Sequence, residues 1–377
     1  MKTLDLLQEK LGKPYKDLGF LLNILKEVLL ESNEKEKANA IPWINQDIQS
    51  SDDEFKDDYI HLYSVVFQLL NIAEVNAAVQ NRRYKEDKSY DSINGLWGNT
   101  FTILKEVGLQ ETEIAAALSN IYTEPVLTAH PTEAKRNIVL NHNRQIYLLM
   151  VKLENAMYTK SEVKQIRDEI KMNLHRLWRM GDIFIEKPDI ETELDNVMHY
   201  LTNVFPKVIP IHDDRFRAAW EHAGFNLDNL RSSQNYPQIR FGNWVGGDRD
   251  GHPFVTAEVT HHTLIKLRLG AFIVIKRELQ NLIDKLGFRI DVIKTELRFA
   301  KRFNDISLEL GGFADKVISK YPNEPFRQFA NMLMLKLPID IRREHAVKLK
   351  ENAFSYQRSF DLLDDLQILQ DALEQYG

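Results

Sequence analysis

The residues from Asp57 to about Arg83 contain neither glycine nor proline, and this uninterrupted run constrains the fold more than any other feature. The run predicts a long helix, as does the segment from Asp17 to Glu31, whose apolar residues recur at three- and four-residue spacing. A further helical stretch ends near Asn120. Helical patterns follow at 133–158, 161–183, 191–205, 213–223, 256–286, 325–336 and 345–375, and strand signals at 125–129, 238–244 and 288–293. The sequence therefore predicts a mostly α protein with a little sheet.

The composition and charge narrow the possible classes of function. The chain has 377 residues, 44% of them hydrophobic and 28% charged, which is typical of a globular protein with two or three domains. Its net charge of −6 argues against nucleic-acid binding, which needs clustered cations. Without cysteine, the sequence has no disulfides or thiolate metal sites. Asp5 and Glu9 lie where a signal peptide would need an uninterrupted apolar segment, and no later run is predicted to span a membrane. We therefore expect a cytoplasmic protein.

Residues 126–133, VLTAHPTE, are expected to place a histidine at the end of a strand. Pro131 disfavours helical backbone in the residue before it, so His130 should remain extended. Thr132 is a suitable N-cap, and a helix is expected to begin after it. Strand-to-helix junctions of this kind bind anions, and imidazole changes its charge near neutral pH, so His130 is a candidate catalytic residue. The alternative is a histidine that only hydrogen-bonds a neighbouring loop.

The stretch 241–253, FGNWVGGDRDGHP, is the second unusual segment, because four of the sixteen glycines lie within ten residues. Clustered glycines let the backbone approach a ligand closely. Arg249 lies between Asp248 and Asp250, and an arginine oriented by carboxylates can bind a carboxylate or phosphate through two hydrogen bonds. The alternative is a tight hairpin-like turn whose aspartates cap backbone amides. A magnesium site at the two aspartates is less favoured, because Arg249 lies between them and further carboxylates are missing from the neighbouring sequence.

Taken together, TAHPTE and NWVGGDRDGHP resemble, in this order, the two signatures of phosphoenolpyruvate carboxylases. Further blocks that resemble the family are LGKPYKDLGFLLNILKEVL, FQLLNIAEVNAAVQNRR, EKPDIETELDNVMHYLTNVFPKVIP, EPFRQFANMLMLKL and YQRSFDLLDDLQILQDALEQYG. The resemblance implies a helical protein with a few parallel strands of an incomplete β/α-barrel of the TIM type. Residues 1–120 would then form a helical N-terminal region, and residues 121–377 would carry the first barrel strands with long helical insertions.

The resemblance also implies a lyase that joins phosphoenolpyruvate to bicarbonate and yields oxaloacetate and phosphate, with Mg²⁺ or Mn²⁺ as cofactor. By that analogy, His130 is the catalytic base that deprotonates carboxyphosphate, so that CO₂ is released beside the enolate. Trp244, Arg249 and Asp248 would line the same pocket and bind substrate, the indole shielding the reaction from water and the arginine holding anionic groups. The family further implies a homotetramer.

The match extends over roughly the first two-fifths of the family's usual length. Neither a second carboxylate cluster for the metal nor the family's later HGRGG loop is found in the sequence. We therefore expect an N-terminal part of a larger barrel enzyme, with no metal ligands of its own, inactive alone and prone to aggregate or to recruit a partner. Residues 340–344, DIRRE, resemble the family's DIRQE strand but come too early in the chain, so we interpret them as a decoy.

Smaller departures from the family bear on regulation and on the pocket. Arg136-Asn137 and Phe184-Ile185 stand where relatives carry basic pairs, which argues against an anionic activator site. His252 replaces the usual asparagine, and Val245 the usual methionine. Two alternatives remain open. One is a non-catalytic helical relative that binds an anion or a protein, and the other is a phosphotransfer protein using the histidine of TAHPTE, which the following proline disfavours.

Overall fold

The computed structural model describes the chain in eight stretches and divides it into two compact units. The described residues are 12–44, 57–128, 137–180, 189–230, 235–249, 253–290, 296–342 and 345–376. Unit 1 comprises Met1–Thr123, His130–Asp189 and Asp214–Gln238. Unit 2 comprises Glu124–Ala129, Ile190–Asp213 and Ile239–Gly377.

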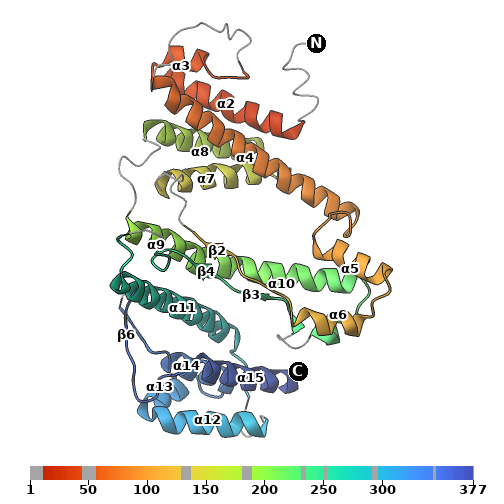
Figure 1. Cartoon of the computed structure of the whole chain (residues 1–377), viewed down its shortest axis with the longest axis vertical. Coiled ribbons are helices and arrows are strands. Elements are labelled where there is room, and N and C mark those ends of the chain that lie inside the picture. Colours follow the sequence, from red (N-terminus) through yellow and green to blue (C-terminus); the bar gives the residue numbers. More distant parts are fainter. Residues whose placement is uncertain are drawn as a thin grey trace. The chain divides into compact units, whose positions relative to one another are not determined.

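The first part of unit 1 is a bundle of long helices (Figure 1). They are α2 (Lys13–Glu31), α4 (Asp57–Lys88), α7 (Asn137–Leu153) and α8 (Lys160–Arg179), with the short α3 (Lys35–Asn39) after α2. The periodic apolar face predicted for α2 is buried, at Leu18, Leu21, Leu22, Leu25, Val28 and Leu29. Each fully buried leucine contributes roughly 1.5–3 kcal/mol. Packing of this face, more than intrinsic helix propensity, therefore stabilises α2.

Helix α4 departs from the expectation that no later segment could span a membrane. The helix continues past Arg83 to Lys88, and its stretch Tyr59–Lys88 contains an 18-residue window that is long and apolar enough to cross a bilayer. Half of that window is buried inside the protein, where α4 contacts α2, α7 and α8. A core helix of a bundle passes the same test of length and hydropathy, so the window is weak support for a membrane span.

The rest of unit 1 packs around an aromatic cluster. The predicted helical stretch before Asn120 consists of α5 (Trp97–Glu106) and α6 (Glu111–Leu118), separated by Gly108 with a φ of 89°. These helices pack with the 3₁₀ turn η2 (Leu227–Leu230) and with the part of α10 that belongs to unit 1. The buried rings of the cluster are Phe101, Phe216, Trp220 and Phe225.

The helices predicted at 191–205 and 213–223 form one continuous helical segment, so the predicted break is wrong. The segment consists of α9 (Ile190–His199), the π-helical turn η1 (Tyr200–Val204) and α10 (Phe205–His222). The chain remains helical through Pro206 and Pro210, and the helix widens by a π turn just before the first of these prolines. The predicted helix 256–286 is confirmed as α11 (Ala257–Lys285).

The C-terminal part of unit 2 is a second helical core, formed with α11 by α12 (Leu297–Leu310), α13 (Gly312–Lys320), α14 (Pro325–Leu335) and α15 (Ser359–Tyr376). Helices α12 and α13 were not predicted, whereas α14 was. The predicted helix 345–375 is wrong over its first part, because β6 (His345–Leu349) pairs antiparallel with β5 (Ile339–Arg342). The first residues of the DIRRE segment therefore lie in a strand, and its interpretation as a decoy stays a prediction.

The remaining strands are short. They are β1 (Tyr122–Thr123), β2 (Val126–Leu127), β3 (Gln238–Ile239) and β4 (Gly242–Asn243). Two of the predicted strand regions, 125–129 and 238–244, thus contain strands. Residues 288–290 are not a strand, and 291–293 lie outside the described residues. The mostly helical character is confirmed, and the incomplete barrel stays a prediction.

Candidate functional site

The parallel pair β2 and β4 brings the two unusual sequence segments to one edge of a sheet (Figure 1). Val126 pairs with Gly242 and Leu127 with Asn243. The amide of Trp244 donates to the carbonyl of Leu127 at 2.9 Å, so the pairing continues into the first residue of the glycine-rich loop. Because the strands are parallel, the chain leaves both of them at the same edge. The residues that follow β2 and those that follow β4 therefore start as neighbours.

An apolar base lies behind this strand edge. Leu194 and Val197 of α9 and Val245 of the loop are almost completely buried together, and Leu127 of β2 packs against them. Val245 thus faces the core while its neighbour Trp244 is 57% exposed. Val245, where the sequence resemblance expects a methionine, therefore lies in the packing behind the loop and not on its exposed surface.

The loop after β4 is a tight turn organised by its own backbone. The carbonyl of Trp244 accepts hydrogen bonds from the amides of Gly247 at 3.0 Å and Asp248 at 2.9 Å. The side chain of Asn243 accepts from the amide of Val245 at 3.0 Å and donates to its carbonyl at 2.8 Å. The alternative prediction of a tight turn therefore describes the backbone at residues 244–248, whereas capping of amides by the aspartates stays a prediction. The turn is compatible with a ligand at its exposed side.

Glycine is required at one position of this turn. Gly246 has a φ of 74°, a conformation that L-residues rarely adopt. A Cβ atom there would also lie only 2.1 Å from Oγ1 of Thr263, a buried residue of α11. The close approach to α11 explains why a glycine occurs at this position.

An open depression of about 540 Å³ lies over the turn, lined by Asn243, Trp244, Gly247 and Asp248. The structure thus brings together two of the predicted substrate-binding residues, Trp244 and Asp248. Arg249 follows them as an exposed residue at the end of the turn. The sequence interpretation missed Asn243, although an asparagine at the end of a strand is typical of side-chain-capped turns.

Several predicted residues lie outside the described part of the chain. They are His130 with its neighbours Pro131 and Thr132, then Arg136, Phe184 and Ile185, and finally Asp250 and His252. Thr128 directly follows β2 and is the last described residue before the histidine. The orientation of Arg249 by two aspartates also stays a prediction, because one of the two is not described.

A divalent cation does not fit the residues that the structure describes. Among them, no group of three or more histidine, aspartate or glutamate side chains could hold a metal ion. Asp248, the one described member of the Asp248 and Asp250 pair, is exposed at the turn. This part of the chain therefore supports no chemical step through a metal.

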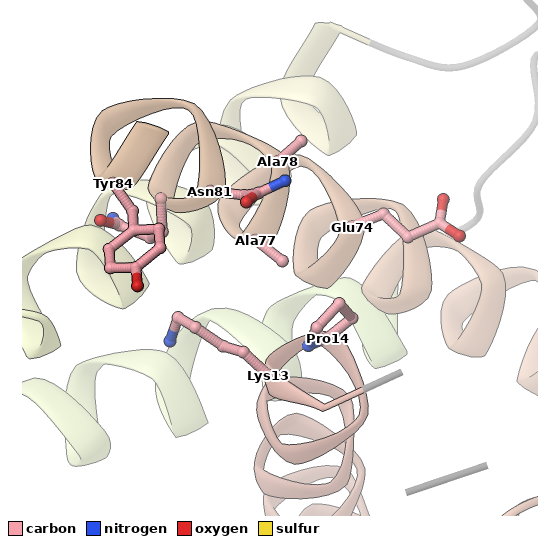
Figure 2. A pocket seen from close by; sticks show the side chains of 8 residues that line it. Lys13, Pro14, Glu74, Ala77, Ala78, Asn81 and Tyr84 are labelled. Carbon is pink, nitrogen blue, oxygen red and sulfur yellow. The ribbon is translucent and has the colours of Figure 1, made fainter. Parts of the chain in front are cut away.

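A second pocket, of about 560 Å³, lies within unit 1. Figure 2 shows Lys13 and Pro14 at the start of α2 opposite Ala77, Asn81 and Tyr84 of α4. Much of its lining is apolar, and the ammonium group of its lysine is already engaged in ion pairs within the fold.

The ammonium group of Lys13 is paired with two carboxylates. Its Nζ atom lies 3.1 Å from Asp17 Oδ1 and 2.6 Å from Glu154 Oε1. Asn76, which is fully buried, donates to both carboxylates at 2.9 and 3.1 Å. Burial lowers the pKa of Lys13, but the hydrogen bonds and charges of the two carboxylates outweigh it and raise the pKa above its usual value. This network joins α2, α4 and the end of α7, so we assign the pocket a structural role.

Comparison with known proteins gives a consistent result. The family model described as phosphoenolpyruvate carboxylase matches residues 3–377. The phosphoenolpyruvate carboxylase of Methylorubrum extorquens is 28% identical over 335 residues, which cover 87% of this chain and 35% of that protein. Those of Xanthomonas euvesicatoria (27% over 318 residues, 84% and 34%) and Xanthomonas oryzae (25% over 374 residues, 98% and 39%) are similar. The chain spans a little over a third of the length of these curated relatives.

Proposed function

Because the chain belongs to the phosphoenolpyruvate carboxylase family, we propose that it takes part in the carboxylation of phosphoenolpyruvate by bicarbonate, which yields oxaloacetate and phosphate. The observation that supports this function most strongly is the parallel pairing of β2 with β4, from which the TAHPTE and GGDRDG segments leave at one edge. Since the curated relatives are much longer than this chain, the chain would supply the N-terminal part of the active site of a longer enzyme.

His130 is proposed as the catalytic base. Bicarbonate attacks the phosphoryl group of phosphoenolpyruvate, which breaks the bond to the enol oxygen and gives carboxyphosphate and the enolate of pyruvate. His130 then accepts the proton of the carboxyl group of carboxyphosphate, which splits into CO₂ and phosphate. The enolate attacks CO₂ and forms oxaloacetate. A histidine is suited to this proton transfer because its pKa lies near neutral pH.

The glycine-rich turn would bind and protect the reacting groups. The exposed indole of Trp244 provides an apolar surface that excludes water from the enolate. Arg249 would bind anionic groups of the substrate, since a guanidinium can donate two parallel hydrogen bonds to a carboxylate or phosphate. Asp248 at the same turn would orient this arginine.

The divalent cation implied by the family, Mg²⁺ or Mn²⁺, would be held by residues beyond those described here. We further propose a cytoplasmic location and, by analogy with the family, a homotetrameric enzyme. The conclusion that the isolated chain is inactive belongs to the same proposal, because the metal ligands would be missing from it.

The first test is to read the encoding gene past codon 377 and to assay the longest product for metal-dependent oxaloacetate formation. His130→Asn in that product is expected to lower kcat about 10²–10⁴-fold, as loss of a general base does. His261→Asn, at an exposed position of α11, is the matched control and should leave kcat unchanged. Full activity of the His130 variant would refute the assigned role. A stop codon after residue 377 would favour the non-catalytic, anion- or protein-binding relative.

A further inference from the structure

The π turn between α9 and α10 has a specific cause in the sequence. An α-helical hydrogen bond to the carbonyl of Thr202 would require the amide N–H of residue 206, and Pro206 has none. The helix widens in η1, where the amide of Phe205 bonds to the carbonyl of Tyr200. The carbonyl of Thr202 accepts a hydrogen bond from Nη2 of Arg277 in α11 at 2.8 Å. Arg277 thus supplies the donor that the proline lacks.

Helix α11 contacts α9 and η1 along their length, and the two segments run side by side (Figure 1). At the start of α9, the ammonium group of Lys266 is paired with Glu191 and lies 2.7 Å from Asp195 Oδ1. In the middle, Gly270 faces Met198 and Thr202: a Cβ atom there would lie 2.1 Å from Cε of Met198 and 3.3 Å from Cγ2 of Thr202, so a larger residue would displace the end of the methionine side chain. Arg277 forms the last of these contacts, at η1. The position of α9 along α11 is therefore defined at both ends.

The adjoining face of α9 forms the base of the candidate site, and Met198 packs against it as well. Leu194 is 1% exposed and Val197 is 5% exposed, and both pack with Val245 of the glycine-rich turn and with Leu127 of β2. A shift or rotation of α9 would move Val245, because packed side chains transmit displacement to their neighbours. Val245 is bonded directly to Trp244, whose indole is exposed at the depression.

We propose that Arg277 is a positioning residue for the candidate site, acting through η1 and α9 on Val245 and the indole of Trp244. Its guanidinium is partly exposed and is oriented by a second hydrogen bond, from Nε to Oε1 of Glu278 at 3.2 Å. The importance of this positioning for catalysis rests on the proposed function. The structural coupling itself does not, and it can be measured without turnover.

The chain offers a direct probe of this coupling. It contains five tryptophans, of which Trp244 belongs to unit 2 and the others to unit 1: Trp43, Trp97, Trp178 and Trp220. The full chain labelled with 5-fluorotryptophan therefore gives one ¹⁹F resonance from the site and four internal references. Trp244→Phe assigns the site resonance.

Arg277→Met removes the donors and keeps an unbranched side chain, whereas Arg277→Lys keeps a donor. Arg268→Met is the matched control, because Arg268 lies on the same helix in an ion pair with Glu351 at 3.5 Å. We expect Arg277→Met to shift or broaden the Trp244 resonance and to leave the other four unchanged. Arg277→Lys should return it toward the wild-type position, and Arg268→Met should not move it.

An unchanged Trp244 resonance in Arg277→Met would overturn the proposal. So would loss of dispersion of all five resonances, which would indicate a general folding role, or a control variant that shifts Trp244 equally. Because no substrate is used, these outcomes are independent of whether the carboxylation assay succeeds, and failure of that assay leaves the positioning role of Arg277 intact.

Discussion

Replacing Asp365 by asparagine is expected to destabilise unit 2 by about 3 kcal/mol, the low end for breaking a buried ion pair. Asp365 lies on α15 and is 1% exposed. Its carboxylate accepts hydrogen bonds from Nε and Nη2 of Arg302 at 2.6 and 3.0 Å and from the hydroxyl of Tyr356 at 2.7 Å. Asparagine keeps the shape of the side chain but loses the charge, and its NH₂ group would face other donors.

The magnitude follows from what the substitution leaves behind. Removing one partner of a buried ion pair costs about 3–5 kcal/mol, because the other charge remains buried without compensation. The side chain of Arg302 is 31% exposed, so water recovers part of this cost and the lower value applies. The hydrogen bond with Asp365 raises the pKa of Arg302 in the wild type. In the variant the arginine still stays charged, because a guanidinium is not deprotonated in proteins even without that carboxylate.

The assay is urea unfolding monitored by hydrogen exchange with mass spectrometry. Peptides from α12 and α15 report on unit 2 alone. Asp371→Asn is the matched control on the same helix. Asp371 Oδ2 lies 3.2 Å from Arg298 Nη1, and its side chain is 36% exposed. Exposed ion pairs of this kind contribute about 0–1 kcal/mol, so the control should stay within that range.

Equal destabilisation by the two substitutions, or a loss below about 1 kcal/mol for Asp365→Asn, would refute the reasoning that burial sets the cost. The double variant Asp365→Asn/Arg302→Met gives a further check. Because it removes both charges, it should be more stable than Asp365→Asn alone. A double variant that loses the sum of the two single effects would show that the pair is not coupled.

Three further substitutions test other parts of the fold. Burial raises the pKa of Tyr356 above its usual value of 10.0, so just above pH 10 only the unfolded chain releases the hydroxyl proton. Deprotonation therefore stabilises the unfolded state of the wild type but not that of Tyr356→Phe. The stability advantage of the wild type over this variant should shrink above pH 10, as measured by urea titration. Burial would raise the pKa of Glu154, but the hydrogen bond from Lys13 helps to lower it below 4.5. Glu154→Gln should therefore lower the free energy of unfolding by about 1 kcal/mol at pH 7. This loss of stability should disappear as pH falls below 4.5, in acid unfolding monitored by circular dichroism. Gly246→Ala should cost at least ~1–2 kcal/mol from its positive φ, whereas Gly247→Ala, with its nearest atom 3.7 Å away, should cost below about 0.5 kcal/mol in thermal unfolding.

The helices were predictable where their signal is local. The leucines of α2 define an amphipathic face within one segment, and the structure buries that face. The run without glycine or proline likewise marks α4 within one segment. Helix α12 carries the same signal at Phe299, Phe303, Ile306 and Leu310, all buried, and could have been predicted by the same criterion. The local sequence therefore contains enough information to predict this helix as well.

The continuous α9–η1–α10 segment and the β5–β6 hairpin were not predictable in this way. Prolines usually end helices, and only a widened turn with a donor from Arg277 allows the chain to remain helical before Pro206. His345–Leu349 forms a strand because Ile339–Arg342 pairs with it. In both cases a partner outside the segment decides the local conformation.

In the candidate site, too, some features follow from local sequence and others only from tertiary contacts. The residue pattern alone predicts a strand before TAHPTE, a glycine-rich turn around Arg249, and membership of one family. The residue pattern does not predict that Val126 pairs with Gly242. Strands of two residues are too unstable to form alone, and the two partners are distant in sequence. The tertiary structure decides this pairing by burying Leu127 and Val245 on α9, and only that burial brings the two segments to one edge.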